Sequence, residues 1–308
     1  MNKIKTALIS VWDKTNIVEF AKFLADQDIQ IFSTGGTKKI LQKNDIDVLS
    51  ISDITGQKEV MDGRVKTLDP KIFGGILADR SNKKHISDLD EMNANYIDMV
   101  IVNLYPFKNE AIDKKLENSD AIEFIDIGGP SMLRAAAKNY ENVIPICQVQ
   151  DYSDFKNIYL DNNGVVSLKD RLNFALKVFK LTNSYDNMIY NYFLNNESLN
   201  IEISKHEDLR YGENPHQKSS FYLPDNEEIQ WEQISGKKLS YNNYFDIEAA
   251  ISIVYEFKDL SCSIIKHSNP CGFAFGSNLK AAYLRAVSVD PVSYFGGIVA
   301  FNYCVDLN

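Results

Sequence analysis

Two short segments of this 308-residue chain bring glycines, hydroxyls and a cation to places that suit an anionic ligand. Thr34-Gly35-Gly36-Thr37 follows an apolar run and opens a helical one, so unpaired peptide N–H groups and the helix dipole would attract an anion. Ser10 and Lys14 follow another apolar run and could reach a phosphate held at those glycines. A tight strand–helix turn, with Asp13 as the N-cap of the next helix, explains the same residues without a ligand.

A third segment, residues 63–71, alternates cationic and apolar side chains. Arg64 and Lys66 fall on the same side of an extended chain, and Thr67 adds a hydroxyl. Two cations and a hydroxyl suit an anionic substrate. The alternative is an ordinary solvated surface, where most Lys and Arg side chains lie.

Polar groups also surround a glycine turn in the middle of the chain. Asn103 and Tyr105 close an apolar run, and Asp126 precedes Gly128-Gly129-Pro130, a strong signal for the start of a helix. Lys138 lies near the far end of that helix. A carboxylate and an amine can act as an acid/base pair, although a helix cap and a surface lysine would look the same.

A Lys266-His267 pair directly follows an apolar run, and Asn269-Pro270 and Gly272 are expected to turn the chain just after it. Histidine can move protons near neutral pH. A lone histidine is more often part of a core, but the lysine and the turn favour a functional role. A second polar cluster, residues 209–217, contains Arg210 and Tyr211 and would be costly to maintain without a ligand.

The elements that must position these residues alternate between strands and helices. The predicted strands are Thr6–Val11, Gln30–Ser33, Val48–Ile51, Met99–Leu104 and Val143–Cys147. Helical spacing lies between them, which predicts an α/β fold with a mainly parallel sheet. Ligands of such sheets bind at the carboxyl ends of the strands, where the candidate residues fall.

A long helix is predicted from Ser167, with a possible break near Asn183-Ser184. Its apolar side chains are expected on one broad face; they are Leu172, Leu176, Phe179, Met188 and Tyr192. The polar, turn-rich residues 195–200 then predict a domain boundary, with domains at residues 1–196 and 197–308.

Composition narrows the class of protein. The chain is 44% hydrophobic and 24% charged, which is typical of a globular protein. A net charge of −9 argues against nucleic acid as a partner. Four dispersed cysteines and four dispersed histidines give no metal-ligand spacing, and sparse cysteine fits a reducing compartment. No apolar run approaches the ~20 residues of a membrane span, so the expected location is the cytoplasm.

Together the motifs resemble a known family. The strings GRVKTL, NLYPF, IDIGG…LRAAAKN, LRYGENPHQ, LSYNN, KHSNPCG and DPVS-x-FGGI occur in the order found in bifunctional 5-aminoimidazole-4-carboxamide ribonucleotide (AICAR) formyltransferase/IMP cyclohydrolases. The resemblance implies two enzymes of purine biosynthesis. A methylglyoxal-synthase-like domain would close formyl-AICAR to IMP, and a cytidine-deaminase-like transformylase domain would move formyl from the co-substrate 10-formyltetrahydrofolate to AICAR, without a catalytic metal.

The resemblance also assigns roles to residues. The implied phosphate site consists of Ser10, Lys14, Thr34, Gly35, Gly36 and Thr37. The implied cyclohydrolase centre consists of Arg64, Lys66, Thr67, Asn103, Tyr105, Asp126 and Lys138. In the second domain Lys266 and His267 would be the catalytic pair, and Arg210, Tyr211 and Asn243 would bind nucleotide.

Some features depart from the family or leave other functions open. Asp69 and Phe73 stand where the family usually has histidine. The family's transformylase domain continues past Asn308, so the cyclohydrolase part is expected to be complete and the transformylase part truncated; the family also implies a homodimer. A methylglyoxal-synthase-type lyase and a nucleotide-binding regulatory module share the phosphate turn but do not need Lys266 and His267.

Overall fold

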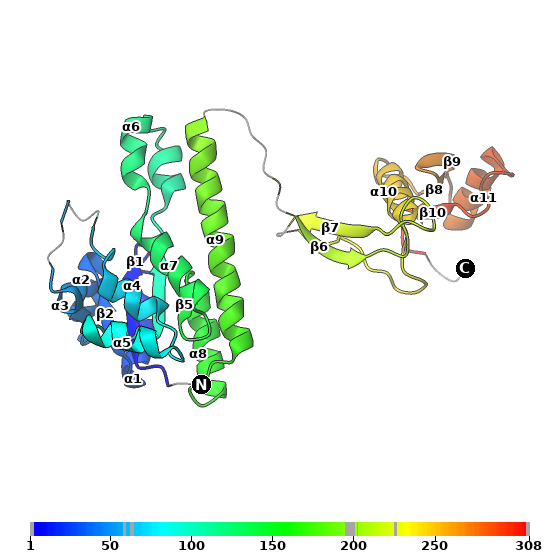
Figure 1. Ribbon diagram of the computed structural model, residues 1–308. Helices are drawn as coiled ribbons and strands as arrows, with labels where there is room; N and C mark the ends of the chain where they lie inside the picture. Colours follow the sequence, from blue (N-terminus) through cyan, green and yellow to red (C-terminus); the bar gives the residue numbers. More distant parts are fainter. Residues whose placement is uncertain are drawn as a thin grey trace. The chain divides into compact units, whose positions relative to one another are not determined.

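The computed structural model describes residues 3–57, 60–61, 65–194, 201, 203–224 and 227–305. The chain divides into two compact units, Met1–Ser198 (unit 1) and Leu199–Asn308 (unit 2). Figure 1 shows both units, with most of their helices and strands labelled. The boundary predicted between residues 196 and 197 lies outside the described residues.

Unit 1 contains a five-stranded sheet in the order β3-β2-β1-β4-β5, and every neighbouring pair is parallel. Its strands are β1 (Thr6–Val11), β2 (Gln30–Ser33), β3 (Leu49–Ser50), β4 (Met99–Asn103) and β5 (Ile144–Ile146). The central strands are almost entirely apolar because helices cover both faces of the sheet. The predicted parallel α/β fold is therefore confirmed for this unit.

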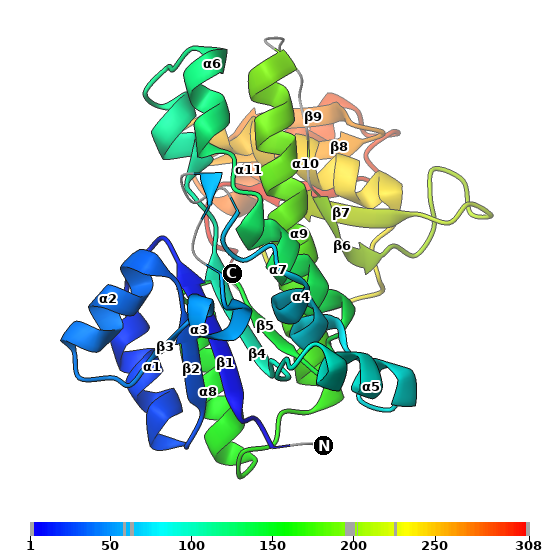
Figure 2. The ribbon, with the colours of Figure 1, turned by 60° about the vertical axis from the view of Figure 1, so that its left-hand side comes forward.

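Alternate residues of β1 enter two separate cores. Ala7 and Ile9 pack with α1 (Ile17–Asp26), α2 (Gly35–Lys43) and α8 (Asp151–Asp161), whereas Leu8 packs on the opposite face. The helices of that opposite face are α3 (Ile51–Thr55), α4 (Pro70–Leu77), α7 (Gly128–Lys138) and α9 (Leu168–Leu194). Helix α5 (Lys83–Glu91) follows α4, and Figure 2 shows the sheet between these layers. The two-sided cover fixes where each strand ends, and thereby where the candidate site residues lie.

The third strand is shorter than predicted. Residue Ile51 does not extend it but begins α3, because Ser50 and Asp53 form a capping box in which the Asp53 carboxylate accepts the Ser50 N–H at 2.8 Å. Asp69 likewise caps α4 by accepting the Lys71 N–H at 2.8 Å. The residue that departs from the family pattern thus has a local structural role here.

Two expectations about the long helix were wrong. Helix α9 runs without a break through Asn183 and Ser184 for 27 residues. Its apolar residues also do not share one face: at about 100° per residue, Met188 and Tyr192 lie opposite Leu172 and Leu176. Met188 and Tyr192 pack in a core, whereas Leu172 and Leu176 are 40% and 56% exposed.

The C-terminal half of α9 is covered by residues 107–125, here called the cap. The cap contains η2 (Lys108–Ile112), α6 (Asn118–Ala121) and η3 (Ile122–Phe124). Phe107, Ala111 and Ala121 of the cap form a small core with Tyr185 of α9. Figures 1 and 2 both show α6 beside the upper end of α9. The cap joins Tyr105 to Asp126, two of the predicted site residues.

Unit 2 is built from antiparallel strands. The sheet β10-β8-β9 and the pair β6-β7 consist of β6 (Ile203–Asp208), β7 (Ser220–Pro224), β8 (Ser261–Lys266), β9 (Asn269–Phe275) and β10 (Ile298–Phe301). Helices α10 (Tyr241–Tyr255) and α11 (Leu279–Val289) pack against the three-stranded sheet. Its buried core is small, with Cys262, Ile264, Ala282 and Ala286 at the centre.

The turn after β8 also differs from the prediction. His267 and Ser268 form it, with φ values of 52° and 59°, whereas Asn269, Pro270 and Gly272 lie within β9. Two consecutive residues with positive φ match the two-residue hairpin turns that join twisted antiparallel strands. Among the described residues, no helix is long and apolar enough to cross a membrane.

Candidate active site

The carboxyl ends of β1 and β2 bring two predicted phosphate-site residues together. The hydroxyls of Ser10 and Thr34 are 2.9 Å apart. Thr34 is the N-cap of α2, yet its side chain does not cap the helix, so it leaves the first N–H groups of α2 to other partners. Thr37 is buried, and its hydroxyl donates to the Val11 carbonyl at 3.0 Å. Thr37 therefore fixes α2 to β1 rather than facing outward.

The loop after β1 folds back on itself. The Lys14 ammonium donates to the Val11 carbonyl, and burial lowers the pKa of Lys14, while the charge of Asp13 acts in the opposite direction. Asp13 is not the N-cap of α1, because its carboxylate accepts the N–H and the hydroxyl of Thr15 at 2.9 and 2.6 Å. Asn16, in the left-handed conformation, precedes the helix instead.

Asn103 at the end of β4 holds this loop in place. Its side-chain oxygen accepts the N–H groups of Trp12 and Asp13 at 2.6 and 3.0 Å, and its Nδ2 donates to the Asp13 carbonyl at 3.0 Å. The side chain predicted to meet a ligand is thus hydrogen-bonded to the loop that carries Lys14. Its observed contacts give it a positioning role.

Lys66 reaches the glycine turn of α2. A Cβ atom at Gly35 would lie 2.8 Å from Lys66 Nζ, and Gly35 has a φ of 24° that favours glycine. At Gly36 a Cβ atom would meet nothing within 4 Å. The Lys66 ammonium therefore lies directly over the amino end of α2, where both charge and dipole attract an anion.

Thr67, the next residue, reaches a second helix. A Cβ atom at Gly128 would lie 2.9 Å from Thr67 Oγ1, at the amino end of α7. Adjacent residues of one loop thus contact the amino ends of α2 and α7. These ends follow β2 and β4, which flank β1, so the loop spans the edge of the sheet at which ligands of parallel sheets bind.

Asp126 lies at the start of α7 beside this loop. Its carboxylate accepts the Gly129 N–H at 2.9 Å and the N–H of Tyr105. Burial raises the pKa of Asp126 above its usual range, although these two hydrogen bonds act in the opposite direction. A carboxyl whose pKa is moved toward neutrality suits proton transfer.

The remaining predicted residues of unit 1 are placed differently. Tyr105 is 49% exposed beside Asp126. Lys138 is exposed at the other end of α7, about 15 Å along the helix axis from Gly128. The structure therefore does not bring the predicted Asp126–Lys138 acid/base pair together. Arg64 lies outside the described residues.

In unit 2 the hairpin carries the predicted catalytic pair. The Lys266 ammonium donates to the carbonyl oxygens of Phe295 at 3.1 Å and Ser293 at 3.5 Å. His267 is exposed at the tip of the turn. The Ser268 N–H donates to the Asp246 carboxylate at 2.7 Å, so α10 anchors the turn.

The predicted nucleotide-binding residues of unit 2 lie close to the start of α10. The Arg210 guanidinium stacks on the Tyr211 ring at 4.8 Å, and the Tyr211 carbonyl accepts the Tyr241 N–H at 3.1 Å. Asn243 forms a capping box with Ser240, whose N–H donates to Asn243 Oδ1 at 3.0 Å. The observed role of the Asn243 oxygen is to cap the helix.

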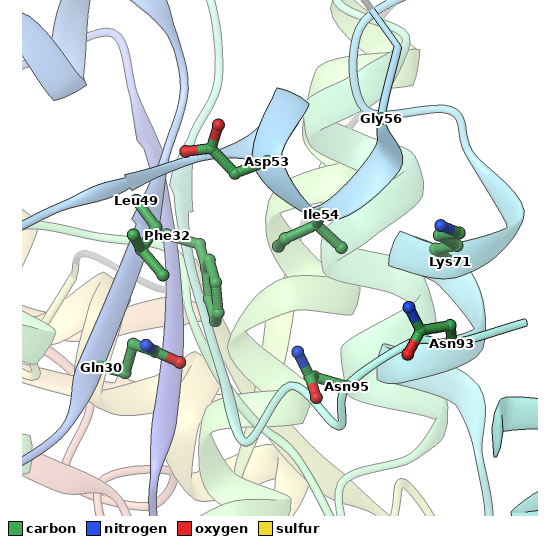
Figure 3. Close-up of a pocket in the computed structure, with 9 residues that line it drawn as sticks. All are labelled: Gln30, Phe32, Leu49, Asp53, Ile54, Gly56, Lys71, Asn93 and Asn95. Atoms are coloured by element: carbon green, nitrogen blue, oxygen red, sulfur yellow. The ribbon is translucent and has the colours of Figure 1, made fainter.

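One cavity lies away from these residues. It has a volume of about 320 Å³, and Figure 3 shows its lining. Phe32, Leu49 and Ile54 contribute apolar surface, and Asp53 and Lys71 contribute opposite charges. None of the nine lining residues is a predicted site residue. Within the described ranges, no group of three or more His, Cys, Asp or Glu side chains is placed to hold a metal.

Two residues at these sites were missed by the sequence reasoning. Tyr185 of α9 accepts the Asp126 N–H at 2.9 Å, and Asp246 anchors the turn of His267. Each contact joins residues more than 20 positions apart. Tyr185 carried only the helical signal of α9, which indicates burial but not the partner.

The fold and the site of unit 1 define the class of protein. A doubly wound parallel sheet with a lysine over the amino end of α2 agrees with a methylglyoxal-synthase-like domain, and residues 16–131 match the model of the MGS-like domain. Residues 136–308 match the model of the AICARFT/IMPCHase bienzyme. The chain belongs to the AICARFT/IMPCHase bienzyme family.

Curated relatives carry the description bifunctional purine biosynthesis protein PurH. The chain is 50% identical over 308 residues to the protein of Fusobacterium nucleatum and 47% identical over 309 residues to that of Clostridium botulinum. These alignments cover 98% of this chain but 61% and 62% of the relatives, so the chain spans under two thirds of their length. A solved structure entitled "Crystal structure of ForH" is 32% identical, with a TM-score of 0.55, over 61% of this chain and 96% of that one.

Proposed function

We propose that unit 1 is an IMP cyclohydrolase that closes formyl-AICAR to IMP with loss of water. The observation that carries this proposal is the Lys66-Thr67 loop, which bridges the amino ends of two helices beside the half-buried Asp126 carboxyl. One helix end would hold the ribose phosphate, and the other would face the reacting groups. The PurH description of the curated relatives supports the same reaction.

In this reaction the carboxamide nitrogen attacks the formyl carbon. A C–N bond forms, the formyl oxygen gains negative charge, and the nitrogen loses a proton. Lys66 would stabilise the developing oxyanion, and Asp126 would accept the proton of the attacking nitrogen and pass it to the former formyl oxygen. The C–O bond then breaks, the formamide nitrogen loses its own proton as the ring C=N bond forms, and that proton completes the departing water. Holding the two groups in contact supplies much of the acceleration, because the reaction is intramolecular.

We infer that unit 2 contributes Lys266 and His267 to formyl transfer from 10-formyltetrahydrofolate to AICAR. His267 would take the proton of the weakly nucleophilic amine, and Lys266 would stabilise charge on the leaving group. The resemblance supports these roles. The location of the pair at one hairpin, with Lys266 at the end of β8 and His267 exposed in the turn, agrees with a site to which further segments contribute.

Two other parts of the hypothesis rest mainly on the resemblance. A homodimer through unit 2 is consistent with the 84% and 80% exposure of the apolar side chains Val292 and Phe295. A cytoplasmic location is consistent with four free cysteines, of which two are buried.

The decisive experiment presents formyl-AICAR to the purified chain and follows IMP by its absorbance. Ring closure that is abolished by Lys66→Ala would support the proposal. Binding of the nucleotide without turnover would favour the regulatory module. Release of methylglyoxal from a triose phosphate, without ring closure, would favour the lyase.

Formyl transfer is assayed separately with AICAR and 10-formyltetrahydrofolate. We expect formyl transfer to be much slower than ring closure in this chain. Lys266 and His267 lie at a hairpin to which further segments would contribute, and an error of about 1 Å in the position of a catalytic group can cost ~10²-fold in rate. Comparable rates for the two half-reactions would show that the described arrangement of unit 2 is sufficient.

A further inference from the structure

A buried tyrosine connects the long helix of unit 1 to the segment that carries Asp126. The Tyr185 hydroxyl accepts the Asp126 N–H at 2.9 Å and lies 3.4 Å from the Phe124 carbonyl, to which it donates. Tyr185 is 6% exposed, and 59 residues separate it from Asp126. The contact therefore holds the backbone on the amino-terminal side of Asp126.

The other side of Asp126 is fixed by α7. The Gly129 N–H donates to the carboxylate, and a Cβ atom at Gly129 would collide with it. Ile127, the residue before the helix, does not cap it with a side chain. Because the first turn of α7 fixes the carboxylate, the remaining freedom lies in the backbone of residues 124–126, which Tyr185 restrains.

We propose that Tyr185 is a positioning residue for Asp126, because it holds the Asp126 backbone so that the carboxyl keeps its place at the start of α7. The inference rests on the proposed ring closure for its kinetic consequence, but not for its geometry. Tyr185 would not touch the substrate. It would act through the peptide group of Asp126.

The cap has contacts with α9 besides the Tyr185 hydroxyl. Tyr192, two helical turns further along, donates its hydroxyl to the Leu116 carbonyl of the cap. The ring of Tyr192 packs edge-on against Phe107 at 5.3 Å, and Phe193 lies 6.5 Å from Phe107. The Tyr185 hydroxyl also donates to the Phe124 carbonyl of the cap, but unlike the Tyr192 hydroxyl it accepts the Asp126 N–H as well.

The hydroxyl keeps its proton over the range in which an assay would be run. Burial raises the pKa of Tyr185 to about 12, and the charges of Asp126 and Asp186 act in the same direction. Two other charged groups lie in this region: Asp186 is the next residue of α9, and Lys66 belongs to the loop beside the start of α7. Both are present in every variant compared below, so a difference in the Asp126 titration between variants reports the substitution itself. A neutral hydroxyl can accept from Asp126 and donate to Phe124 at the same time.

The test compares two tyrosines of the same helix. Tyr185→Phe removes the hydroxyl that binds Asp126, and Tyr192→Phe removes a hydroxyl that binds only the cap. We expect Tyr185→Phe to lower kcat for ring closure about 10-fold, to leave KM within about twofold and to shift the acidic limb of the pH–rate profile. Tyr192→Phe should leave kcat within twofold of that of the unchanged chain and should leave the pH–rate profile at the same position.

A double variant and a titration separate positioning from general destabilisation. In an Asp126→Asn background, Tyr185→Phe should lower the residual kcat by less than twofold, because the two residues act as one unit. The Asp126 carboxyl, followed by ¹³C NMR, should titrate at a different pH in Tyr185→Phe and at an unchanged pH in Tyr192→Phe.

Equal kinetic effects of the two substitutions, or full additivity with Asp126→Asn, would overturn the inference. If the unchanged chain closed no ring, the proposed function would fail, and the titration would decide the inference by itself. An Asp126 titration that Tyr185→Phe leaves unchanged would then refute it.

Discussion

The two units hold their candidate catalytic residues in different ways. In unit 1, Lys66 and Asp126 come from separate segments and are fixed by contacts with the amino ends of two helices. In unit 2, Lys266 and His267 are neighbours at one hairpin, and a single carboxylate, Asp246, anchors the turn. The comparison indicates that substitutions in unit 1 should disturb a geometry set by many contacts, whereas the unit 2 hairpin should respond locally.

The hydrophobic cores of the two units differ as well, and unit 1 has the larger one. The parallel sheet of unit 1 is buried on both faces by two extensive clusters. Among the described residues of unit 2, the hydrophobic cluster around Cys262 and Ile264 is much smaller, and large apolar side chains such as Val292 and Phe295 are exposed. Rigid packing restricts side-chain positions, so the geometry of unit 1 is the more strongly determined of the two.

The largest expected effect tests whether Lys66 and Lys138 are equivalent. Lys66→Ala should lower kcat for ring closure by about 10²–10⁴-fold, because a positioned charge over the amino end of α2 is lost. Lys138→Ala should change kcat by less than about 10-fold, since this side chain is exposed at the far end of α7. Steady-state turnover of formyl-AICAR checks both.

This result discriminates between the resemblance and the geometry. The resemblance implies that both lysines belong to the reacting centre, whereas in the structure Lys66 lies over the amino end of α2 and Lys138 lies at the far end of α7. Near-normal turnover in Lys66→Ala would refute the proposed role of Lys66 in ring closure. A large loss in Lys138→Ala, with unchanged circular dichroism, would show that the far end of α7 takes part.

The next effect concerns two neighbouring glycines of the α2 turn. Gly35→Ala should lower kcat about 10- to 100-fold, because its Cβ would displace Lys66 Nζ and its φ of 24° strains any side chain. Gly36→Ala is the matched control, since a Cβ there meets nothing within 4 Å. Similar kcat values for the two variants would show that Lys66 does not act from its position over Gly35.

Local patterns predicted much of unit 1. The alternation of apolar runs with helical spacing predicted β1, β2 and β4, and the glycine turn predicted the start of α2. These signals are strong because burial on both faces makes the strands continuously apolar. The rule that ligands bind at strand ends directed attention to the same edge of the sheet, where Ser10 and Thr34 meet.

Contacts between distant residues could not be predicted in the same way. The partner of Asn103 is the loop after β1, 90 residues away, and the partner of Asp126 is Tyr185. No local periodicity encodes such pairs. A break in α9 was expected at Asn183 and Ser184, which have low helix propensity. The helix instead continues through them, because its packing against the sheet, α7 and the cap outweighs this propensity.

A smaller effect should separate two aspartates of unit 1 by sign. Burial raises the pKa of Asp126, so the folded chain favours the protonated carboxyl, and ionisation lowers the free energy of unfolding. The stability that the protonated carboxyl contributes is fully present below the unfolded-state pKa and is lost as pH rises through the raised value. Asp126→Asn should therefore unfold at a higher temperature than the unchanged chain at pH 7. The difference should shrink as pH falls toward ~4.

Asp13 provides the opposite case. Hydrogen bonds from Thr15 lower the pKa of Asp13, so its stabilising contribution is present above the unfolded-state pKa and is lost as pH falls through the lowered value. Asp13→Asn should therefore unfold at a lower temperature at pH 7, with a difference that vanishes in acid. Differential scanning calorimetry at several pH values measures the unfolding temperatures of both variants. If Asp126→Asn and Asp13→Asn changed the unfolding temperature in the same direction at pH 7, the opposite pKa shifts assigned to the two aspartates would be contradicted.

The smallest expected effect tests how locally the hairpin of unit 2 is determined. Ser268 has a φ of 59°, a conformation that costs a serine more than a glycine. Glycine also loses more backbone entropy on folding, which offsets part of the gain, so Ser268→Gly should stabilise the β8–β9 hairpin by about 0.5 kcal/mol. The hydrogen bond to Asp246 is retained because the backbone N–H donates it.

Amide hydrogen exchange in β8 and β9 measures the change, and Ser252→Gly, inside α10, is the control that should destabilise its helix instead. Slower exchange restricted to β8 and β9 would support a locally determined turn, whereas changes that extend into α11 would show that unit 2 couples its turn to its core as strongly as unit 1 does.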